Sequence, residues 1–283
     1  MAISKRRASQ LKNELKYNKG ILVATAALIV ITLISLFAFL SPYDPDALNM
    51  TARLQGPSMQ HLFGTDDLGR DYLTRVLYGG RVSLLVGVVA MLISTFIGVL
   101  VGTVSGYFGG LIDSILMRIV DVLLSIPWMI LVTVISIYMR PGIQAIILVI
   151  GLFQWMNIAR LVRAETLTVK EREYVLYADS INQSHLFIIL KHVIPSVLPT
   201  IVVAATTGIA NAIMMESTLS FLGMGVQQPM SSWGSMLNRA QEVLGKAPYM
   251  AILPGLMIIA TVFSFNKLGD LIRVFAEPKT IER

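Results

Sequence analysis

The polar residues best placed to carry a function lie in residues 160–196, which interrupt an otherwise apolar chain. In the middle of this stretch, a helical register brings Val175, Ala178 and Ile181 to one side and leaves charged and aromatic residues on the others. The small side chain of Ala178 leaves room for another surface to approach closely. The stretch therefore predicts a short amphipathic helix, either one that docks onto a partner protein or an ordinary helix at the membrane interface.

The end of this predicted helix is marked by Asn182, because asparagine is among the few residues other than glycine that accept a left-handed backbone conformation. Pro195 and Pro199 then end the polar segment, since proline interrupts a preceding helix. We expect a turn at Asn182 before the chain returns to apolar sequence.

A second candidate is Glu216, which directly follows the charge-free run Val193–Met215. An ionisable residue in a membrane span is a functional candidate by default, and together with Asn211 and Met215 it would line a translocation path or gate. Ser217 and a glycine-containing turn follow it, which fits an anchor at the outer membrane interface equally well.

Motifs for enzymatic chemistry are missing from the sequence. It has no Gly-x-x-x-x-Gly-Lys-Ser/Thr phosphate loop, no His-Glu-x-x-His site and no Gly-x-Ser-x-Gly elbow. Its three histidines, His61, His185 and His192, are isolated from one another in sequence, and the lack of cysteine excludes disulfides and thiolate metal sites. We therefore expect a non-enzymatic chain without a metal or other cofactor of its own.

The elements that must position these residues are membrane helices. Hydrophobic residues make up 55% of the 283 residues and charged residues only 14%, whereas a soluble domain carries about 25% charge. Six charge-free runs are long enough for a membrane helix, which takes about 20 residues. They are Ile21–Leu40, Val82–Ile112, Val122–Met139, Pro141–Ala159, Val193–Met215 and Ala247–Asn266. Because the runs are continuous rather than alternating, we expect an all-α membrane protein with six transmembrane helices.

Glycine and proline add detail to these spans. A turn at residues 106–110 shortens the second run, and glycines four residues apart give that run one small-residue face for close packing within the bundle. These glycines are Gly98, Gly102 and Gly106. Pro127 and Pro254 predict kinks in the third and sixth spans. Arg118 and Asp121 are three residues apart and predict an ion pair within one helix at the membrane edge.

Basic residues predict the orientation. With six spans both termini lie on one side, and that side carries most of the 23 Lys and Arg residues. By the positive-inside rule, the termini and residues 160–196 face the cytoplasm. The net charge of +6 reflects this bias and contact with anionic membrane lipids. It does not indicate nucleic-acid binding, because no basic patch interleaved with aromatic residues accompanies it.

The first apolar run is expected to stay as an anchor. It is longer than the h-region of a cleaved signal peptide, which has about 7–15 residues, and no small-x-small cleavage site follows it. The predicted organisation has five parts. They are a basic cytoplasmic tail (1–20), a first transmembrane helix (21–40), an external segment (41–81), a five-helix core (82–270) that includes the cytoplasmic loop 160–196, and a cytoplasmic tail (271–283).

Several motifs resemble those of a known family. The polar stretch contains Glu173-Tyr-Val-Leu-Tyr-Ala178-Asp-Ser-Ile-Asn182 and later His192-Val-Ile-Pro195. It resembles the EAA motif of membrane subunits in binding-protein-dependent ABC importers, which reads Glu-Ala-Ala, three residues, Gly, and later Ile-x-Leu-Pro. Further segments are similar to the C-type permease of the oligopeptide, dipeptide and nickel importer family. They are Gly64-Thr-Asp-x-x-Gly-Arg-Asp71, Ser220-Phe-Leu-Gly-x-Gly225, Ser232-Trp-Gly234 and Leu268-Gly-Asp270.

The resemblance implies a type I ABC importer permease fold and a set of partners. The chain would pair with a homologous second permease subunit, receive cargo from an external substrate-binding protein, and dock onto two cytoplasmic ABC ATPase subunits. Those ATPases would bind ATP and Mg, and the chain would be a multi-pass protein of a prokaryotic cytoplasmic membrane. Peptides are the expected cargo, because nothing in the spans has metal-ligand spacing. Nickel or a metal chelate is the alternative, and a stand-alone secondary transporter is the rival from another class.

The resemblance also assigns site residues. The residues that would couple to the ATPases are Glu173, Tyr174, Tyr177, Ala178, Asp179, Asn182 and Ser184. The residues that would form the external mouth or contact the binding protein are Gly64, Thr65, Asp66, Gly69, Arg70 and Asp71, for which a structural cap is an equal explanation. Tyr177 replaces a usual alanine and Asn182 a usual glycine. These two departures predict an ATPase groove of different shape and a preserved turn.

Overall fold

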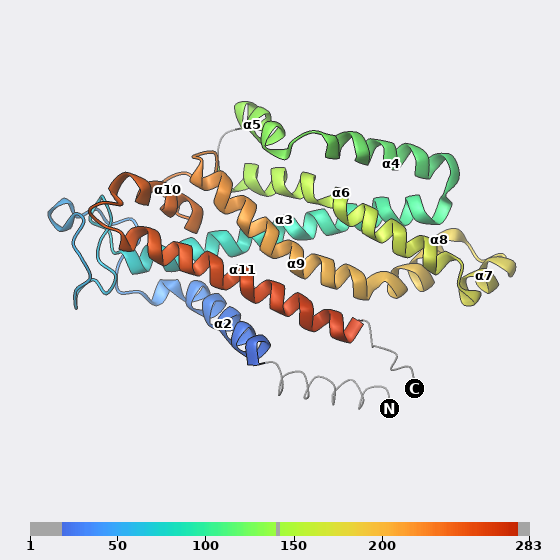
Figure 1. Cartoon of the computed structure of the whole chain (residues 1–283), viewed down its shortest axis with the longest axis horizontal. Helices are drawn as coiled ribbons and strands as arrows, with labels where there is room; N and C mark the ends of the chain where they lie inside the picture. Colours follow the sequence, from blue (N-terminus) through green and yellow to red (C-terminus); the bar gives the residue numbers. More distant parts are fainter. Residues whose placement is uncertain (1–18, 140–141, 277–283) are drawn as a thin grey trace.

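Membrane-length helices dominate the structure, as the apolar runs predict (Figure 1). The computed structural model describes residues 19–139 and 142–276. Five helices in these ranges are long and apolar enough to cross a membrane, and one bent pair is a sixth candidate span. Regular structure in the same ranges is helical, apart from a single bridge between Thr65 and Asp71. The all-α membrane fold is thus confirmed.

The long helices run side by side along an elongated molecule (Figure 1). They are α2 (Lys19–Leu36), α3 (Tyr72–Phe108), α6 (Ile143–Lys170), α9 (Ile194–Phe221) and α11 (Tyr249–Ala276). The shorter helices are α4 (Gly110–Ser125), α5 (Trp128–Tyr138), α7 (Glu173–Ser180), α8 (His185–Ile188) and α10 (Trp233–Val243). Three further turns are the 3-10 helices η1 (Ala38–Leu40) and η2 (Met50–Ala52) and the π-helix η3 (Ile189–Val193).

The two ends of the molecule differ in what they carry. Residues 41–71 and α10 lie at one end, and α7 and α8 lie at the other (Figure 1). The start of α2 and the end of α11 both point toward the α7 end. Most of the two predicted tails, 1–18 and 277–283, lies outside the described residues, as does Pro141 at the predicted start of the fourth span.

Several helices extend beyond the apolar runs that predicted them. α3 begins at Tyr72 rather than Val82, and α6 continues to Lys170, so the first part of the stretch 160–196 is helix and not loop. The 37 residues of α3 make a helix about 55 Å long, whereas the hydrocarbon core of a membrane is about 30 Å thick. Apolar runs report only the part of a helix inside that core, so they underestimated the length.

The third predicted span is broken rather than kinked. α4 ends at Ser125 and α5 begins at Trp128, and their axes differ by 84°. Pro127 lies at the break, where its ring disfavours a helical conformation at Ile126, and Ile126 is extended with ψ of 125°. Pro254 in contrast lies inside α11, which continues through it.

The small-residue face of α3 packs against α6, as predicted. A Cβ added at Gly102 would lie 2.5 Å from the carbonyl oxygen of Ala159, and one at Gly98 would lie 2.6 Å from the Cβ of Ile158. Gly106 meets the next turn of α6 in the same way. Only glycine allows these two backbones to come so close.

Ion pairs hold α4 against α6 after the chain reverses at residues 109–110. Asp113 accepts hydrogen bonds from Nε and Nη2 of Arg163, the second at 2.6 Å, and Asp121 pairs with Arg160. The predicted pair between Arg118 and Asp121 is therefore wrong. The carboxylate of Asp121 pairs instead with Arg160 of α6. Residue spacing within one helix cannot predict a partner on another helix.

Candidate functional site

α7 is a short helix whose end is fixed by a specific turn. The N–H of Gln183 donates to the carbonyl oxygen of Ala178 at 3.2 Å, and the N–H of Asn182 donates to that of Asp179 at 2.9 Å. This is the Schellman pattern of helix termination, in which the residue after the cap adopts a left-handed conformation. Asn182 does so with φ of 54°, which confirms the predicted turn.

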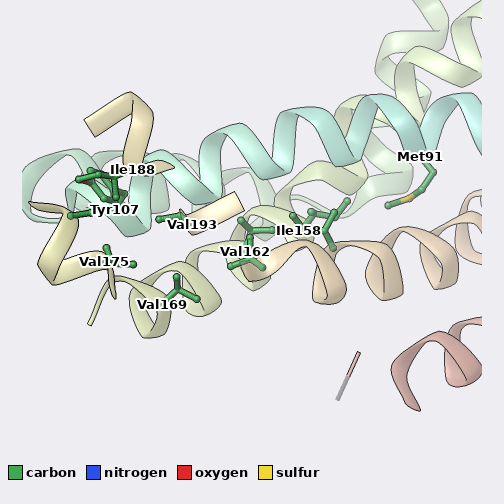
Figure 2. Close-up of a cluster of buried hydrophobic side chains, with 11 residues drawn as sticks. Met91, Tyr107, Ile158, Val162, Val169, Val175, Ile188 and Val193 are labelled. Atoms are coloured by element: carbon green, nitrogen blue, oxygen red, sulfur yellow. The ribbon is translucent and has the colours of Figure 1, made fainter. Parts of the chain in front are cut away.

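One face of α7 is buried against its own chain. Val175 and Ala178 are each only 2% exposed and belong to a hydrophobic cluster with Tyr107 of α3, Ile188 of α8 and Val193 of η3 (Figure 2). Ala178 is therefore small because its own subunit approaches it, and the expectation that it admits another surface is wrong in this structure. A small residue on a helix indicates that its face is closely packed. It does not indicate whether the same chain or a partner protein packs against that face.

The rest of α7 is exposed and carries large apolar side chains beside the charged Glu173 and Asp179. Tyr177 is 67% exposed, and Leu176 and Ile181 are each 50% exposed. Ile181 was expected on the same side as Val175 and Ala178, but it is the C-cap residue of α7 and is half exposed. Leu186 and Phe187 of α8 extend the exposed apolar surface. We call this surface, with Tyr174, the α7–α8 face.

The predicted coupling residues are distributed unevenly over this region. Those that are exposed are Glu173, Tyr174, Tyr177, Asp179, Asn182 and Ser184. Ser184 also caps α8, because its hydroxyl accepts a hydrogen bond from the N–H of Phe187 at 3.3 Å. Sequence reasoning missed Leu176, Leu186 and Phe187, although large apolar residues beside charged ones outside a membrane span are a usual signal of a binding surface.

Contacts beneath the α7–α8 face connect it to the long helices. The hydroxyl groups of Tyr174 and Ser196 lie 3.0 Å apart, which joins α7 to the start of α9. The hydroxyl oxygen of Tyr107, at the end of α3, lies 3.1 Å from Nδ1 of His185. Nζ of Lys170 lies 5.8 Å from the centre of the Tyr107 ring. These contacts link the α7–α8 face to α3, α6 and α9.

α8, η3 and α9 form one uninterrupted helix from His185 to Phe221. Pro195 and Pro199 were expected to end the polar segment before the next span, but both lie within this helix. Proline lacks an N–H and its ring conflicts with the carbonyl four residues earlier. The π-helical turn at Ile189–Val193 widens the helix just before Pro195, which is where such a conflict needs relief.

The predicted external motif is a closed loop whose polar side chains face inward. Oδ1 of Asp66 accepts hydrogen bonds from the N–H groups of Leu68 at 2.9 Å and Arg70 at 3.0 Å, and its Oδ2 accepts one from Arg70 Nε at 2.7 Å. Asp66 and Arg70 are both buried. A Cβ at Gly69 would lie 1.7 Å from the carbonyl oxygen of Asn49. The loop thus packs onto the preceding segment and needs glycine there.

The rest of the motif anchors α3. Asp71 caps that helix, since its Oδ2 accepts hydrogen bonds from the N–H of Thr74 at 2.8 Å and from its hydroxyl at 2.6 Å. Thr65 is buried and joins the loop to Gln55, whose N–H donates to its hydroxyl at 2.9 Å. Gly64 is buried as well. All six predicted mouth residues are therefore buried in this structure, whereas Met59 in the neighbouring turn is 96% exposed.

Glu216 is completely buried between α3, α9 and α10. Its carboxylate accepts hydrogen bonds from the hydroxyls of Ser220 at 2.7 Å and Ser83 at 3.0 Å. Ser83 in turn accepts a hydrogen bond from the N–H of Trp233 at 3.2 Å. This network ties three helices together at the end that carries α10, and α10 was not predicted.

Asn211 and Met215 instead line an open cavity of about 530 Å³ between α4, α5, α6 and α9. The cavity lies beside the break at Pro127, where α4 and α5 bend away from each other (Figure 1). Its other polar residues are Gln154 and Asn157. Both were missed in the sequence, although two carboxamides three residues apart share one face of a helix in an apolar run. Glu216 does not line this cavity.

Comparisons with known proteins match most of the chain. Residues 98–282 match the family described as the binding-protein-dependent transport system inner membrane component. Residues 11–57 match the N-terminal transmembrane domain of oligopeptide transport permease C.

Individual relatives extend over nearly the whole sequence. The oligopeptide transport system permease protein OppC of Escherichia coli K12 is 41% identical over 262 residues, which are 90% of this chain and 87% of the relative. The glutathione transport system permease protein GsiD of Escherichia coli CFT073 is 41% identical over 93% of this chain and 88% of its own length. The dipeptide transport system permease protein DppC of Bacillus subtilis is 40% identical over 94% of this chain and 83% of its own length.

Proposed function

The chain belongs to the family of inner membrane components of binding-protein-dependent transport systems, and on that premise we propose that it forms half of the translocation path of an ATP-driven peptide importer. Members of this family are non-catalytic permease subunits. The names of the relatives specify oligopeptides, glutathione and dipeptides. Peptides are the cargo class that these names share.

The α7–α8 face is the observation that carries this proposal. It exposes large apolar side chains on α7 and on the first turn of the helix that continues into α9, and such a patch is typical of a protein interaction site. Its residues Tyr174 and Tyr177 belong to the type enriched at binding hot spots. We assign it as the surface that docks onto the cytoplasmic ATPase subunits, which bind ATP and Mg.

Contacts beneath the face support coupling from the ATPases to the membrane. The link from Tyr174 to Ser196 and the buried cluster around Ala178 join α7 firmly to α3 and α9. ATP binding would favour one arrangement of the ATPases and so shift the permease pair between inward-open and outward-open states. Asn211 and Met215 would line the path in this chain, because they face the cavity between α4, α5, α6 and α9.

The end of the molecule with residues 41–71 and α10 would face the external substrate-binding protein. The buried motif at residues 64–71 holds this segment in shape and leaves the exposed turn around Met59 available for contact. In this assignment the motif supports the mouth without touching the binding protein. The homologous second permease would complete the path, and the chain would lie in the cytoplasmic membrane with both termini and α7 in the cytoplasm.

A charge placed on the α7–α8 face tests this assignment. Tyr177→Glu should weaken the binding of the ATPase subunits by about 30-fold or more, as loss of a hot-spot side chain does, and should abolish uptake of radiolabelled peptide. Ala178 is unsuitable for this test, because a bulky charge there would disrupt the packing of its own subunit. The readouts are co-purification of the ATPases and uptake into cells.

Gln241→Glu is the matched control. Gln241 is exposed on α10 at the opposite end of the molecule, and its substitution adds the same charge. It should leave co-purification of the ATPases unchanged. Normal ATPase binding by Tyr177→Glu would overturn the docking assignment. Uptake driven by an ion gradient without ATPases would favour a secondary transporter, and uptake of a nickel chelate but no peptide would overturn the cargo class.

A further inference from the structure

The cavity between α4, α5, α6 and α9 has an unusual chemical lining. Its polar side chains are the carboxamides of Gln154, Asn157 and Asn211. Three methionines, Met156, Met214 and Met215, line it beside aliphatic and aromatic residues, and none of the lining residues is ionisable. A site of this kind offers hydrogen bonds and adaptable apolar contact but no net charge.

The carboxamides that line the cavity have hydrogen-bonding groups available for a ligand. Asn157 and Asn211 are exposed and have no hydrogen-bond partner among residues 19–139 and 142–276. Gln154 Nε2 has only the Sδ of Met215 at 3.3 Å, and a thioether is a weak acceptor. An unsatisfied amide in hydrocarbon costs several kcal/mol. These side chains must therefore face water or a polar ligand rather than lipid.

Charges close to the cavity are neutralised by each other. Arg160 lies three residues beyond Asn157 on α6 and so follows it on the same face of the helix. Its guanidinium is paired with Asp121 of α4, next to the cavity residues Leu123 and Leu124. The cavity therefore has a neutral lining and a neutral edge on this side.

We propose that Gln154, Asn157 and Asn211 bind the amide backbone of an extended peptide in passage, and that the cavity passes peptides irrespective of side-chain charge. This inference rests on the proposed function. Each peptide unit offers one N–H donor and one C=O acceptor, and a carboxamide offers both kinds of partner in one side chain. The methionines would accept varied side chains, since unbranched thioethers fit irregular shapes.

A charge introduced into the cavity should create a selectivity that the native chain lacks. The importer, assembled with its second permease, ATPases and binding protein in proteoliposomes, is supplied with three tripeptides that differ only in a central Lys, Gln or Glu. Asn211→Asp should lower uptake of the Glu peptide relative to the Gln peptide by about three- to tenfold, as expected for like charges in a partly solvated site. Uptake of the Lys peptide should fall less or rise.

Two further variants separate the causes. Asn211→Leu removes the amide without adding charge and should lower uptake of all three peptides by the same factor. Gln241→Glu adds the same charge outside the cavity and should leave the ratios among the three rates unchanged. Because the binding protein is the same in every sample, its own preference cancels when each variant is compared with the native importer.

Three outcomes would overturn the inference. Unchanged peptide ratios in Asn211→Asp would show that the carboxamides do not contact the cargo. Unequal losses in Asn211→Leu would show selection by side chain. Loss of the second permease on purification of either Asn211 variant would place Asn211 in the subunit interface instead. Failure of the proposed function is distinguishable, because the native importer would then take up none of the three peptides.

Discussion

Glu216 shows how burial and partners decide the role of a residue. Its carboxylate is enclosed and accepts hydrogen bonds from Ser83 and Ser220, which join α3 to α9 beside the N-terminus of α10. From the sequence alone, Glu216 could be either a gate residue or an anchor at the membrane interface. We propose that Glu216 is an anchor, because its carboxylate is enclosed, whereas Asn211 and Met215 line the cavity that we propose as the path.

Loss of the Glu216 carboxylate should therefore destabilise the protein. Glu216→Ala leaves two buried hydroxyls without their acceptor and creates a cavity, at a cost of about 2–4 kcal/mol. The midpoint of thermal unfolding of the purified importer should fall by several degrees. Glu216→Gln keeps the shape and one acceptor oxygen, and should lose less. A gate residue would behave differently, with transport lost in Glu216→Gln at an unchanged unfolding midpoint.

Asn182 allows a second test at this scale. The left-handed conformation at φ of 54° costs glycine nothing and other L-residues roughly 1–2 kcal/mol, so Asn182→Gly should keep the turn and normal uptake. Asn182→Val should distort the end of α7 and reduce co-purification of the ATPases. Equal uptake by both variants would show that the turn does not position the docking surface.

The type of residue predicted the turn at Asn182, but it could not predict the partner of Ala178. A small residue on a helix face indicates close approach, and the approaching surface is α8 and η3 of the same chain. The sequence also could not predict that Asp66 and Arg70 point inward. Charged residues in a predicted external segment look the same in sequence whether they face solvent or each other. Local residue spacing does not predict contacts between segments that are distant in the sequence.

Among the elements, the α3–α6 pair depends most directly on its sequence. A Cβ at Gly102 would approach the backbone oxygen of Ala159 to 2.5 Å, and a backbone atom cannot move aside as a side chain can. Gly102→Ala should therefore force the helices apart and destabilise the protein by about 1–3 kcal/mol. Gly255→Ala is the matched control, because nothing lies within 4 Å of a Cβ there. Both are compared by thermal unfolding, and an equal midpoint would contradict close packing as the function of Gly102.

Six apolar runs located the membrane helices, because the bilayer imposes a length of apolar sequence that is easy to recognise. The ends of the helices could not be predicted in the same way, because α3 and α6 continue past their apolar parts into charged sequence. Arg75 of α3 and Arg163 of α6 lie in these continuations. The 11 residues of α10 were missed because they contain no apolar run. Its start was marked by Ser232, whose hydroxyl caps the helix, a signal that hydropathy does not register.

At the scale of the whole molecule, its two ends are built for different contacts. Tyr249 of α11 donates through its hydroxyl to the carbonyl oxygen of Thr65 at 2.8 Å, which joins α11 to residues 41–71. Tyr72 of α3 donates to the carbonyl oxygen of Met250 at 2.5 Å, which joins α3 to α11. The other end carries the α7–α8 face, with α7 at the tip of the molecule (Figure 1) and α8 as the first turn of the helix that continues into α9. Membrane-length helices separate the two surfaces, so in the proposed assignment each meets its partner in a different compartment.

This separation gives a test of orientation in a chain that has no cysteine of its own. Single cysteines introduced as Met59→Cys and Ser180→Cys lie at exposed positions on opposite ends. A membrane-impermeant maleimide should label Met59→Cys in intact cells or spheroplasts and Ser180→Cys only in inside-out vesicles, because the apolar core of about 30 Å blocks the charged reagent. Gln241→Cys on α10 should follow Met59→Cys. Labelling of the first two cysteines from the same side would contradict both the predicted topology and the assignment of α7 to the ATPases, since a surface outside the cell cannot reach a cytoplasmic motor.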